Sequence, residues 1–320
     1  MEEGKAENQT SITEFILLGF GNLPELQIIF FLLFLVIYIV TMTVNMLIVA
    51  LVVADPHLHT PMYFFLGNLS CLEICCTSAI LPKMLSSLLS GDRTISVTGC
   101  IVQFYWFGFL VTAECSLLAV MSYDRYLAIC KPLHYAIHMS GRFCMQLVVG
   151  SWLSSFIILT TLISFMSQLN FCGPNEIDHF FCDLTPVIKL SCSHTNLVTL
   201  VTLIFSSIDT VPPFLLTLIS YVCIISTILR IPSTTGKHKA FSTCSSHLIV
   251  VTLFYGTLIT VYLLPSTGAV KVPNKVFSVF YTVLTPLINP LIYSLRNKKV
   301  KEALKRVLQK CRVFPGSQRN

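Results

Sequence analysis

Charged side chains are scarce in this chain of 320 residues. Only 11% of the residues are Asp, Glu, Lys or Arg, whereas 54% are hydrophobic, and the mean hydropathy is +0.77. So little polar surface cannot cover a soluble globular protein of this size. The apolar runs last 20 or more residues and lack the ten-residue alternation of barrel strands. The composition therefore predicts an all-α membrane protein.

The sequence also lacks a catalytic constellation. No Ser, His or Asp stands in a nucleophile elbow or in a metal-binding helix pattern, and no glycine-rich loop is suited to a phosphate group. The lack of these catalytic patterns argues against an enzyme.

No basic segment with a small-residue cleavage site precedes the first apolar run, so we interpret this run as a retained signal anchor.

Seven apolar segments are long enough to cross a membrane, and the linkers between them are too short for a further domain. No internal repeat is present, and seven spans cannot be divided into two equal halves, which disfavours a transporter or channel. The expected spans cover residues 24–53, 60–88, 97–124, 143–166, 197–229, 240–264 and 272–295.

The positions of Lys and Arg predict the orientation of the chain. With the N-terminus outside, fifteen of these cations lie on cytoplasmic segments and six on outer ones. Residues 1–23 are then extracellular, residues 24–295 form the transmembrane domain, and residues 296–320 form a cytoplasmic tail. This orientation favours glycosylation of Asn8, which begins an Asn-Gln-Thr sequon.

The tail carries apolar residues at helical spacing between cations from Lys298 to Lys310. This pattern is typical of an amphipathic helix that lies along the anionic inner leaflet. Cys311, at its end, is a candidate for palmitoylation, and the alternative is a free thiol in a disordered tail.

The thirteen cysteines differ in their expected location. Cys100, Cys172, Cys182 and Cys192 are expected on the outer side, where disulfides form, and they allow three pairings. The other nine lie in spans or on the cytoplasmic side, where small buried apolar residues are the simpler interpretation. A metal site in residues 179–183 is an alternative that a disulfide at Cys182 would exclude.

Three carboxyl side chains, Glu73, Glu114 and Asp209, lie inside predicted spans. Each would cost about 2.5–3.5 kcal/mol if it faced lipid, so all three are expected to face the bundle interior. Glu73 and Glu114 lie about midway along adjacent spans, where they could share a proton or a sodium ion. The alternative is that each is neutral and hydrogen-bonded to nearby Ser or Asn side chains.

An acid and a base, Asp124 and Arg125, stand at the end of the third span and precede Tyr126. Such a pair at the end of a span is a functional candidate, because it is costly unless the charges pair or face water.

The seventh span contains Pro286 and Pro290, each of which removes a backbone hydrogen bond and favours a kink. Asn289 lies beside the kink and Tyr293 one turn further along. This segment is therefore a candidate two-state hinge.

Long motifs cover nearly the whole chain. The first group is MSYDRYLAIC at residues 121–130, NPLIY at 289–293 and Cys100 in the third of seven spans. The second group is LHTPMYFFL at 58–66, SY at 220–221, KAFSTCSSHL at 239–248, FYG at 254–256 and PLINPLIYSLRN at 286–297. The first group resembles class A, rhodopsin-like G-protein-coupled receptors, and the second resembles their odorant (olfactory) receptor branch.

The resemblance implies two disulfides, Cys100–Cys182 and Cys172–Cys192, which pin the outer loop over a ligand pocket. It also implies that Asp124 and Arg125 pair in the resting state.

On activation, the resemblance implies that Arg125, with Tyr221 and Tyr293 nearby, lines a cytoplasmic cleft that admits a G-protein helix. His247 belongs to the same inner network. The residues assigned to G-protein coupling and activation are Asp124, Arg125, Tyr126, Tyr221, His247, Asn289, Pro290 and Tyr293.

Glu73 and Glu114 match the internal sodium or polar site of the superfamily. The sequence departs from the family pattern at Glu73, where Asp is commoner, and at Ser122, where odorant receptors often carry Ala. The first departure puts the geometry of an ion site in doubt, and the second changes little.

The ligand pocket is expected in the outer half of the bundle, between the third, fifth, sixth and seventh spans, with a mostly apolar lining. An ionised Asp209 could hold an amine or accept a hydrogen bond from a hydroxyl, and a protonated one could donate to a carbonyl. The alternative is a structural role, in which Asp209 bonds to Ser206 or Thr210 across its own turn. Helical spacing selects Phe107, Gly108, Val111, Thr112, Phe205, Ser206, Asp209, Leu258, Ile259, Tyr262, Val279 and Thr282 as lining residues.

The resulting expectation is an odorant receptor that binds small hydrophobic or semi-polar volatile ligands and activates a stimulatory, olfactory-type G protein, which raises cyclic AMP. The expected partners are the odorant, this G protein and membrane lipids, with no nucleic acid and no cofactor apart from the possible sodium ion. The alternatives are a chemosensory receptor that acts outside the nose and, less favoured, a membrane transporter.

Overall fold

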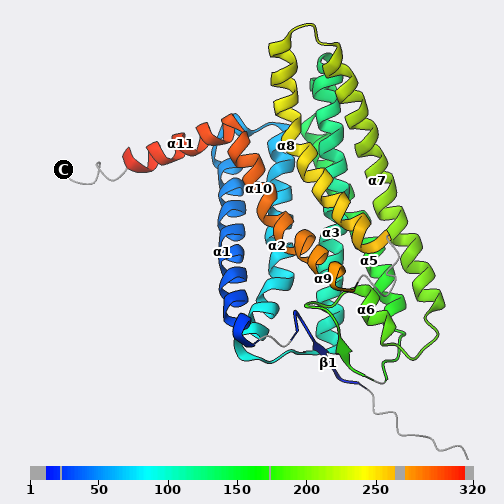
Figure 1. Cartoon of the computed structure of the whole chain (residues 1–320). Helices are drawn as coiled ribbons and strands as arrows, with labels where there is room; N and C mark the ends of the chain where they lie inside the picture. The colour runs from blue at the N-terminus through cyan, green and yellow to red at the C-terminus, as the bar shows by residue number, and fades with distance from the viewer. Residues whose placement is uncertain (1–11, 22–23, 173, 264–270, 314–320) are drawn as a thin grey trace, which may run out of the picture.

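The computed structural model describes residues 12–21, 24–172, 174–263 and 271–313 (Figure 1). Asn8 and the side chains of Tyr262, Tyr293 and Cys311 lie outside the described residues.

In the described part of the chain, seven helices are long and apolar enough to cross a membrane, so the predicted fold class is confirmed. They stand side by side as one bundle (Figure 1). The first five spans are α1 (Pro24–Ala54), α2 (Pro61–Ser90), α3 (Val97–Cys130), α5 (Gly141–Met166) and α7 (Asn196–Arg230). The sixth is α8 (Thr234–Leu258) with the π-helical turn η2 (Ile259–Leu263), and the last consists of α9 (Lys271–Val279), the π-helical turn η4 (Phe280–Leu284) and α10 (Thr285–Arg296).

The outward faces of the spans are apolar. Ile28 and Val36 of α1 are 70% and 58% exposed, and Leu203 and Ile219 of α7 are 57% and 60% exposed. An apolar surface of this extent is suited to lipid and not to water.

Helix α3 lies at the centre of the bundle, where it packs against α2, α5 and α7. It extends six residues beyond the predicted end at residue 124, because Arg125 to Cys130 continue the helix before Lys131 caps it. Pro132 then begins the short helix α4 (Pro132–His138), which the sequence analysis did not predict.

One end of the bundle, here called the strand end, is covered by a small three-stranded sheet. Strands β1 (Glu14–Leu17), β2 (Thr94–Ser96) and β3 (Glu176–Ile177) have the order β2-β1-β3. β1 is antiparallel to β2, with Ile16 opposite Thr94, and parallel to β3. The long loop that contains β3 also holds the helix α6 (Leu184–Lys189).

The opposite end, here called the α11 end, carries the helix α11 (Lys298–Val313), which projects sideways from the bundle (Figure 1). Its buried Val300 and Ala303 face the bundle. Nε and Nη2 of Arg306 donate to Oδ2 of Asp55 at 3.0 and 2.8 Å. Asp55 also caps the short 3₁₀-helix η1 (Pro56–Leu58), so one carboxylate holds the first short loop and α11 together.

Candidate functional site

The side chain of Asp124 is bound from two sides near the end of α3. Nε of Arg125 donates to Oδ2 at 3.0 Å, and Nη2 donates to the same oxygen. The hydroxyl of Tyr135, on α4, donates to Oδ1 at 2.8 Å. The Asp124 and Arg125 side chains are only 1% and 12% exposed, so each charge depends on its partner.

Tyr135 is suited to this donor role. Burial, followed by the Asp124 charge and hydrogen bond, raises the pKa of the Tyr135 phenol above its ordinary value. The hydroxyl therefore keeps its proton and can donate to the carboxylate.

A second polar pair lies between α7 and α8. The Tyr221 hydroxyl and Nδ1 of His247 are 2.5 Å apart, and both side chains are buried. Tyr221 packs with Ile224, Ile228 and Cys244, and the half-buried Tyr126 of α3 lies against this cluster. The network thus contains side chains from α3, α7 and α8.

Two carboxyl groups meet in the middle of the bundle. Glu73 of α2 and Glu114 of α3 lie within reach of each other. Nδ2 of Asn289 donates to Oε1 of Glu73, and lies 3.5 Å from Oε1 of Glu114. All three side chains are at least 97% buried. Two adjacent buried carboxyls cannot both remain charged unless a proton or a cation lies between them.

The surroundings of these carboxyls are compatible with one further small group. Oε2 of Glu73 and Oδ1 of Asn289 are buried without a hydrogen-bond partner. Oxygen atoms of this kind suit a hard cation such as sodium. Among the described residues, no three or more His, Cys, Asp or Glu side chains gather into a candidate metal cluster.

Asn289 is held in place by the helix around it and by α1. Because Pro290 has no N–H, the carbonyl of Pro286 has no donor within the helix, and it accepts a hydrogen bond from Nδ2 of Asn45 at 3.1 Å; Nδ2 of Asn45 also donates to the Thr41 carbonyl. Pro290 is buried and continues α10. The prolines of the last span therefore lie where a neighbouring span supplies the hydrogen bonds.

The long loop at the strand end is fastened by two disulfides. The structure joins Cys100 to Cys182 and Cys172 to Cys192. The backbone N–H of Cys182 donates to Oε1 of Gln103 at 3.0 Å, which binds the loop to α3 a second time. Cys182 is thus not available as a thiolate ligand.

His179, in the same loop, is 5% exposed. Burial, followed by the charge of Lys275, lowers its pKa to about 3, so the imidazole is neutral. Its Nε2 and the hydroxyl of Ser278 are 3.2 Å apart, which links the loop to α9.

The predicted pocket residues are only partly brought together. Phe107 of α3 is buried, and its ring lies 5.3 Å from Phe181 of the long loop and 5.9 Å from Tyr281 of the last span. Thr112 is hydrogen-bonded to Asp209 of α7, a partner that the sequence analysis did not propose for Asp209. The remaining inward members are Leu258 and Thr282, which are buried, and Val111, Phe205, Ile259 and Val279, which are half-buried.

Two predicted residues do not lie with this group. A Cβ atom on Gly108 would be 2.9 Å from Cδ1 of Leu159, so this side of α3 packs against α5. Ser206 is exposed, unlike its neighbour Phe205. The helical spacing placed both residues in the pocket, and the structure does not.

The comparisons with known proteins agree with one another. A family model described as olfactory receptor matches residues 34–311. Human (Homo sapiens) olfactory receptor 11A1 is 51% identical over 308 residues, which are 96% of this chain and 97% of that protein. Mouse (Mus musculus) olfactory receptor 5AP2 is 49% identical over 302 residues (94% and 95%), and human olfactory receptor 10A7 is 50% identical over 313 residues (96% and 99%).

The chain belongs to the olfactory receptor family. It is therefore an odorant-sensing G-protein-coupled receptor in the membrane and a member of a non-enzymatic family, and the odorant receptor resemblance of its motifs is confirmed.

Several contacts of this olfactory receptor were not predicted from its sequence. They involve Tyr135, Asn45, Gln103 and Ser278, which each bind a residue more than ten positions away. The sequence signal for these contacts was weak, because a Tyr after a span or an Asn within a span can have many other structural roles. Only their position beside Asp124, Pro286, Cys182 and His179 gives them a role.

Proposed function

We propose that the receptor binds a small hydrophobic or semi-polar odorant in the strand-end half of the bundle and activates a stimulatory, olfactory-type G protein at the α11 end, which raises cyclic AMP. The strand end is then extracellular and the α11 end cytoplasmic. Support comes from the excess of Lys and Arg on the loops and tail of the α11 end and from the two disulfides at the strand end. Asn8 would be glycosylated in this orientation.

The observation that carries the proposal is the closed arrangement around Arg125. Its guanidinium is tied to Asp124, and Asp124 is tied to Tyr135, so the charge cannot reach a partner protein. Breaking these bonds would free Arg125 to line a cytoplasmic cleft together with Tyr221 and His247. A G protein would stabilise the open arrangement, and an odorant would shift the equilibrium by its preference for that state.

The proposed ligand region combines rings with one acidic group. Phe107, Tyr281 and Leu258 supply apolar surface. Asp209, held by Thr112, supplies a single carboxyl that could accept a hydrogen bond from an amine or a hydroxyl. This composition favours ligands with an apolar body and one polar group.

Glu73, Glu114 and Asn289 would hold the proton or sodium ion of the middle site. This group would reduce the charge of the two carboxyls from −2 to −1, and would thereby stabilise the packing of α2, α3 and α10 in one receptor state.

The test is a cyclic AMP assay with an odorant panel of amines, acids and neutral ketones, in cells that express the receptor and an olfactory-type G protein. Arg125→Gln should abolish the response while surface expression stays near normal. Arg142→Gln, an exposed arginine at the same end, is the matched control and should respond like the parent receptor. Silence of the parent receptor with every ligand, despite confirmed surface expression, would refute the proposal.

Asp209→Asn tests the ligand chemistry. If the carboxylate binds an amine, amine responses should fall and ketone responses should persist. An equal loss of both classes would show a structural role for Asp209.

A further inference from the structure

The strand end of the bundle is closed above the proposed ligand region. His179, Phe180, Phe181 and Cys182 of the long loop are all at least 95% buried. The N-terminal segment lies over them. The main-chain N–H groups of Ile16, Leu18 and Gly19 donate to carbonyls of the long loop, and that of Leu17 donates to the Arg93 carbonyl. A ligand that arrives from this side must displace part of the cover.

One short part of the cover has a distinct construction. Gly19 and Gly21 have φ angles of +60° and +95°, and nothing lies within 4 Å of a Cβ atom placed on either. Glycine is needed here for its backbone freedom and not for space. Between them, the ring of Phe20 is stacked 5.8 Å from Phe34 of α1 and 5.3 Å from Phe180.

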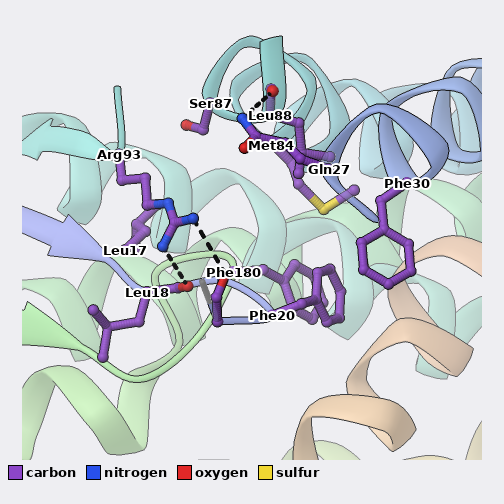
Figure 2. Close-up of a pocket in the computed structure, with 12 residues that line it drawn as sticks. Leu17, Leu18, Phe20, Gln27, Phe30, Met84, Ser87, Leu88, Arg93 and Phe180 are labelled. Atoms are coloured by element: carbon purple, nitrogen blue, oxygen red, sulfur yellow. Dashed lines mark hydrogen bonds between the residues drawn. The ribbon is translucent and has the colours of Figure 1, made fainter. Parts of the chain in front are cut away.

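Two cationic side chains fasten this same part from outside. Lys275 Nζ donates to the Gly19 carbonyl at 3.0 Å and pairs with Asp178 Oδ1 at 2.5 Å. Arg93 donates to the Leu18 carbonyl at 3.3 Å and to the Gly21 carbonyl at 3.2 Å (Figure 2). These contacts join the segment to the last span, the long loop and the α2–β2 loop.

A hollow of about 40 Å³ already lies beneath residues 17–21. Figure 2 shows Phe20 and Phe180 close together, with Phe30 and Met84 beside them. The volume fits about three water molecules and is far below the 300 Å³ or more of a typical ligand pocket. Outward movement of Phe20 would enlarge it.

A continuous column of rings connects the hollow with the proposed ligand region. Phe20 contacts Phe180, Phe180 contacts Phe181 at 5.1 Å, and Phe181 contacts Phe107 at 5.3 Å. Phe107 belongs to the proposed pocket. Each ring can turn only when its neighbour makes room, so Phe20 controls the outer end of the column.

We propose that residues 18–21 form a hinged flap that opens to let small apolar ligands reach and leave the pocket from the strand end. The Phe20 ring closes the entrance, and Lys275 holds the flap in the closed position. Gly19 and Gly21 are the hinges, and the Lys275–Asp178 ion pair is weak because it is partly solvated: the Asp178 side chain is 59% exposed. The ligand part of this proposal rests on the proposed function, but the opening of the flap does not. Access from the lipid between two spans is the competing route.

The first test needs no ligand. Hydrogen exchange of the full receptor in lipid nanodiscs should show faster exchange at residues 18–21 in Lys275→Met, by about two- to fivefold, the range that a partly exposed ion pair supports. Lys189→Met, an exposed lysine at the same end, should match the parent receptor. Unchanged exchange in Lys275→Met and in Phe20→Leu, which removes the stacked ring, would overturn the flap.

The second test measures rates with the odorant that activates the parent receptor in the panel. Lys275→Met should speed both the onset of the G-protein response and its decay after washout by similar factors. A change in potency with unchanged rates would overturn the proposal, because Lys275 would then act on the bound ligand. Silence of the parent receptor would refute the proposed function and leave the exchange result standing.

A disulfide between Ile16→Cys and Thr94→Cys tests whether the flap moves independently of the rest of the cover. These facing residues form a close pair between hydrogen-bonded pairs of the sheet, at a separation that a disulfide can span. Because residues 18–21 lie beyond this link, the response rates should stay those of the two single-cysteine variants. A slower response would show that all of β1 must lift and would overturn the assignment of the hinge to the two glycines.

Discussion

Removal of the Tyr135 hydroxyl should raise the activity of the receptor without ligand. In Tyr135→Phe, Oδ1 of Asp124 loses a hydrogen bond of 2.8 Å while the ring stays to fill its space. The loss weakens the arrangement that holds Arg125, so the resting state should become less favoured relative to the active one.

The size of the effect follows from the burial of the two partners. A hydrogen bond to a charged group contributes about 1.5–3 kcal/mol, and the half-buried position of Tyr135 favours the lower end. About 1.4 kcal/mol changes an equilibrium tenfold, so ligand-free activity should rise by about tenfold while the active fraction is small.

The assay is ligand-free cyclic AMP per receptor at the cell surface. Tyr105→Phe is the matched control, because the Tyr105 hydroxyl pairs with Thr160 on an exposed face, at 3.2 Å. It should leave the ligand-free activity unchanged. Activity of Tyr135→Phe that equals or falls below that of the parent receptor, at equal surface expression, would refute a role for this bond in the resting state.

Three further predictions concern the packing of the spans. Asp55→Asn should release α11 from the bundle, which hydrogen exchange would detect as faster exchange in α11. Hydrogen bonds from Arg306 and then His57 lower the pKa of Asp55, so the stabilisation of α11 by this carboxylate is present above the ordinary pKa of Asp and is lost only in strong acid. The parent receptor should therefore show no such release between pH 5 and 8. Asn45→Ala should lower the stability in detergent by about 1–3 kcal/mol, measured as a lower unfolding temperature, because the buried carbonyl of Pro286 loses its donor. If sodium occupies the middle site, sodium chloride should raise the unfolding temperature relative to choline chloride, and Glu114→Gln should remove that difference; equal temperatures in the two salts would favour a shared proton.

The sequence predicts the structure best where one property, the hydrophobicity of a long segment, determines the result. Long apolar runs must become helices in lipid, so the seven spans were predictable to within a few residues at most ends. The end of α3 was not, because the charged Asp124 and Arg125 interrupt the apolar run, although the mostly apolar residues 126–130 continue the helix. Pattern reasoning stopped at Asp124, where the polarity changes and the helix does not.

The contacts within the site were harder to predict because they depend on which neighbour each helix face meets. Helix α3 packs against α2, α5 and α7, so the period of 3.6 in its sequence cannot tell the face toward α7 from the face toward α5. This is why Gly108 was placed in the pocket although it packs against Leu159. Strand β1 was missed for a related reason: its partners come from two loops that only the folded bundle brings together.

The π-helical turn η4 sets the rotation of one half of the last span against the other. A π turn contains one more residue than an α turn, and one residue corresponds to a rotation of about 100°. Deletion of a single residue from Phe280–Leu284 would leave Asn289 beside Glu73 only if Lys275 and Ser278 turned away from the long loop. The length of this turn therefore keeps the middle of the bundle and its strand end in register, and a receptor shortened by one residue here could satisfy only one of the two.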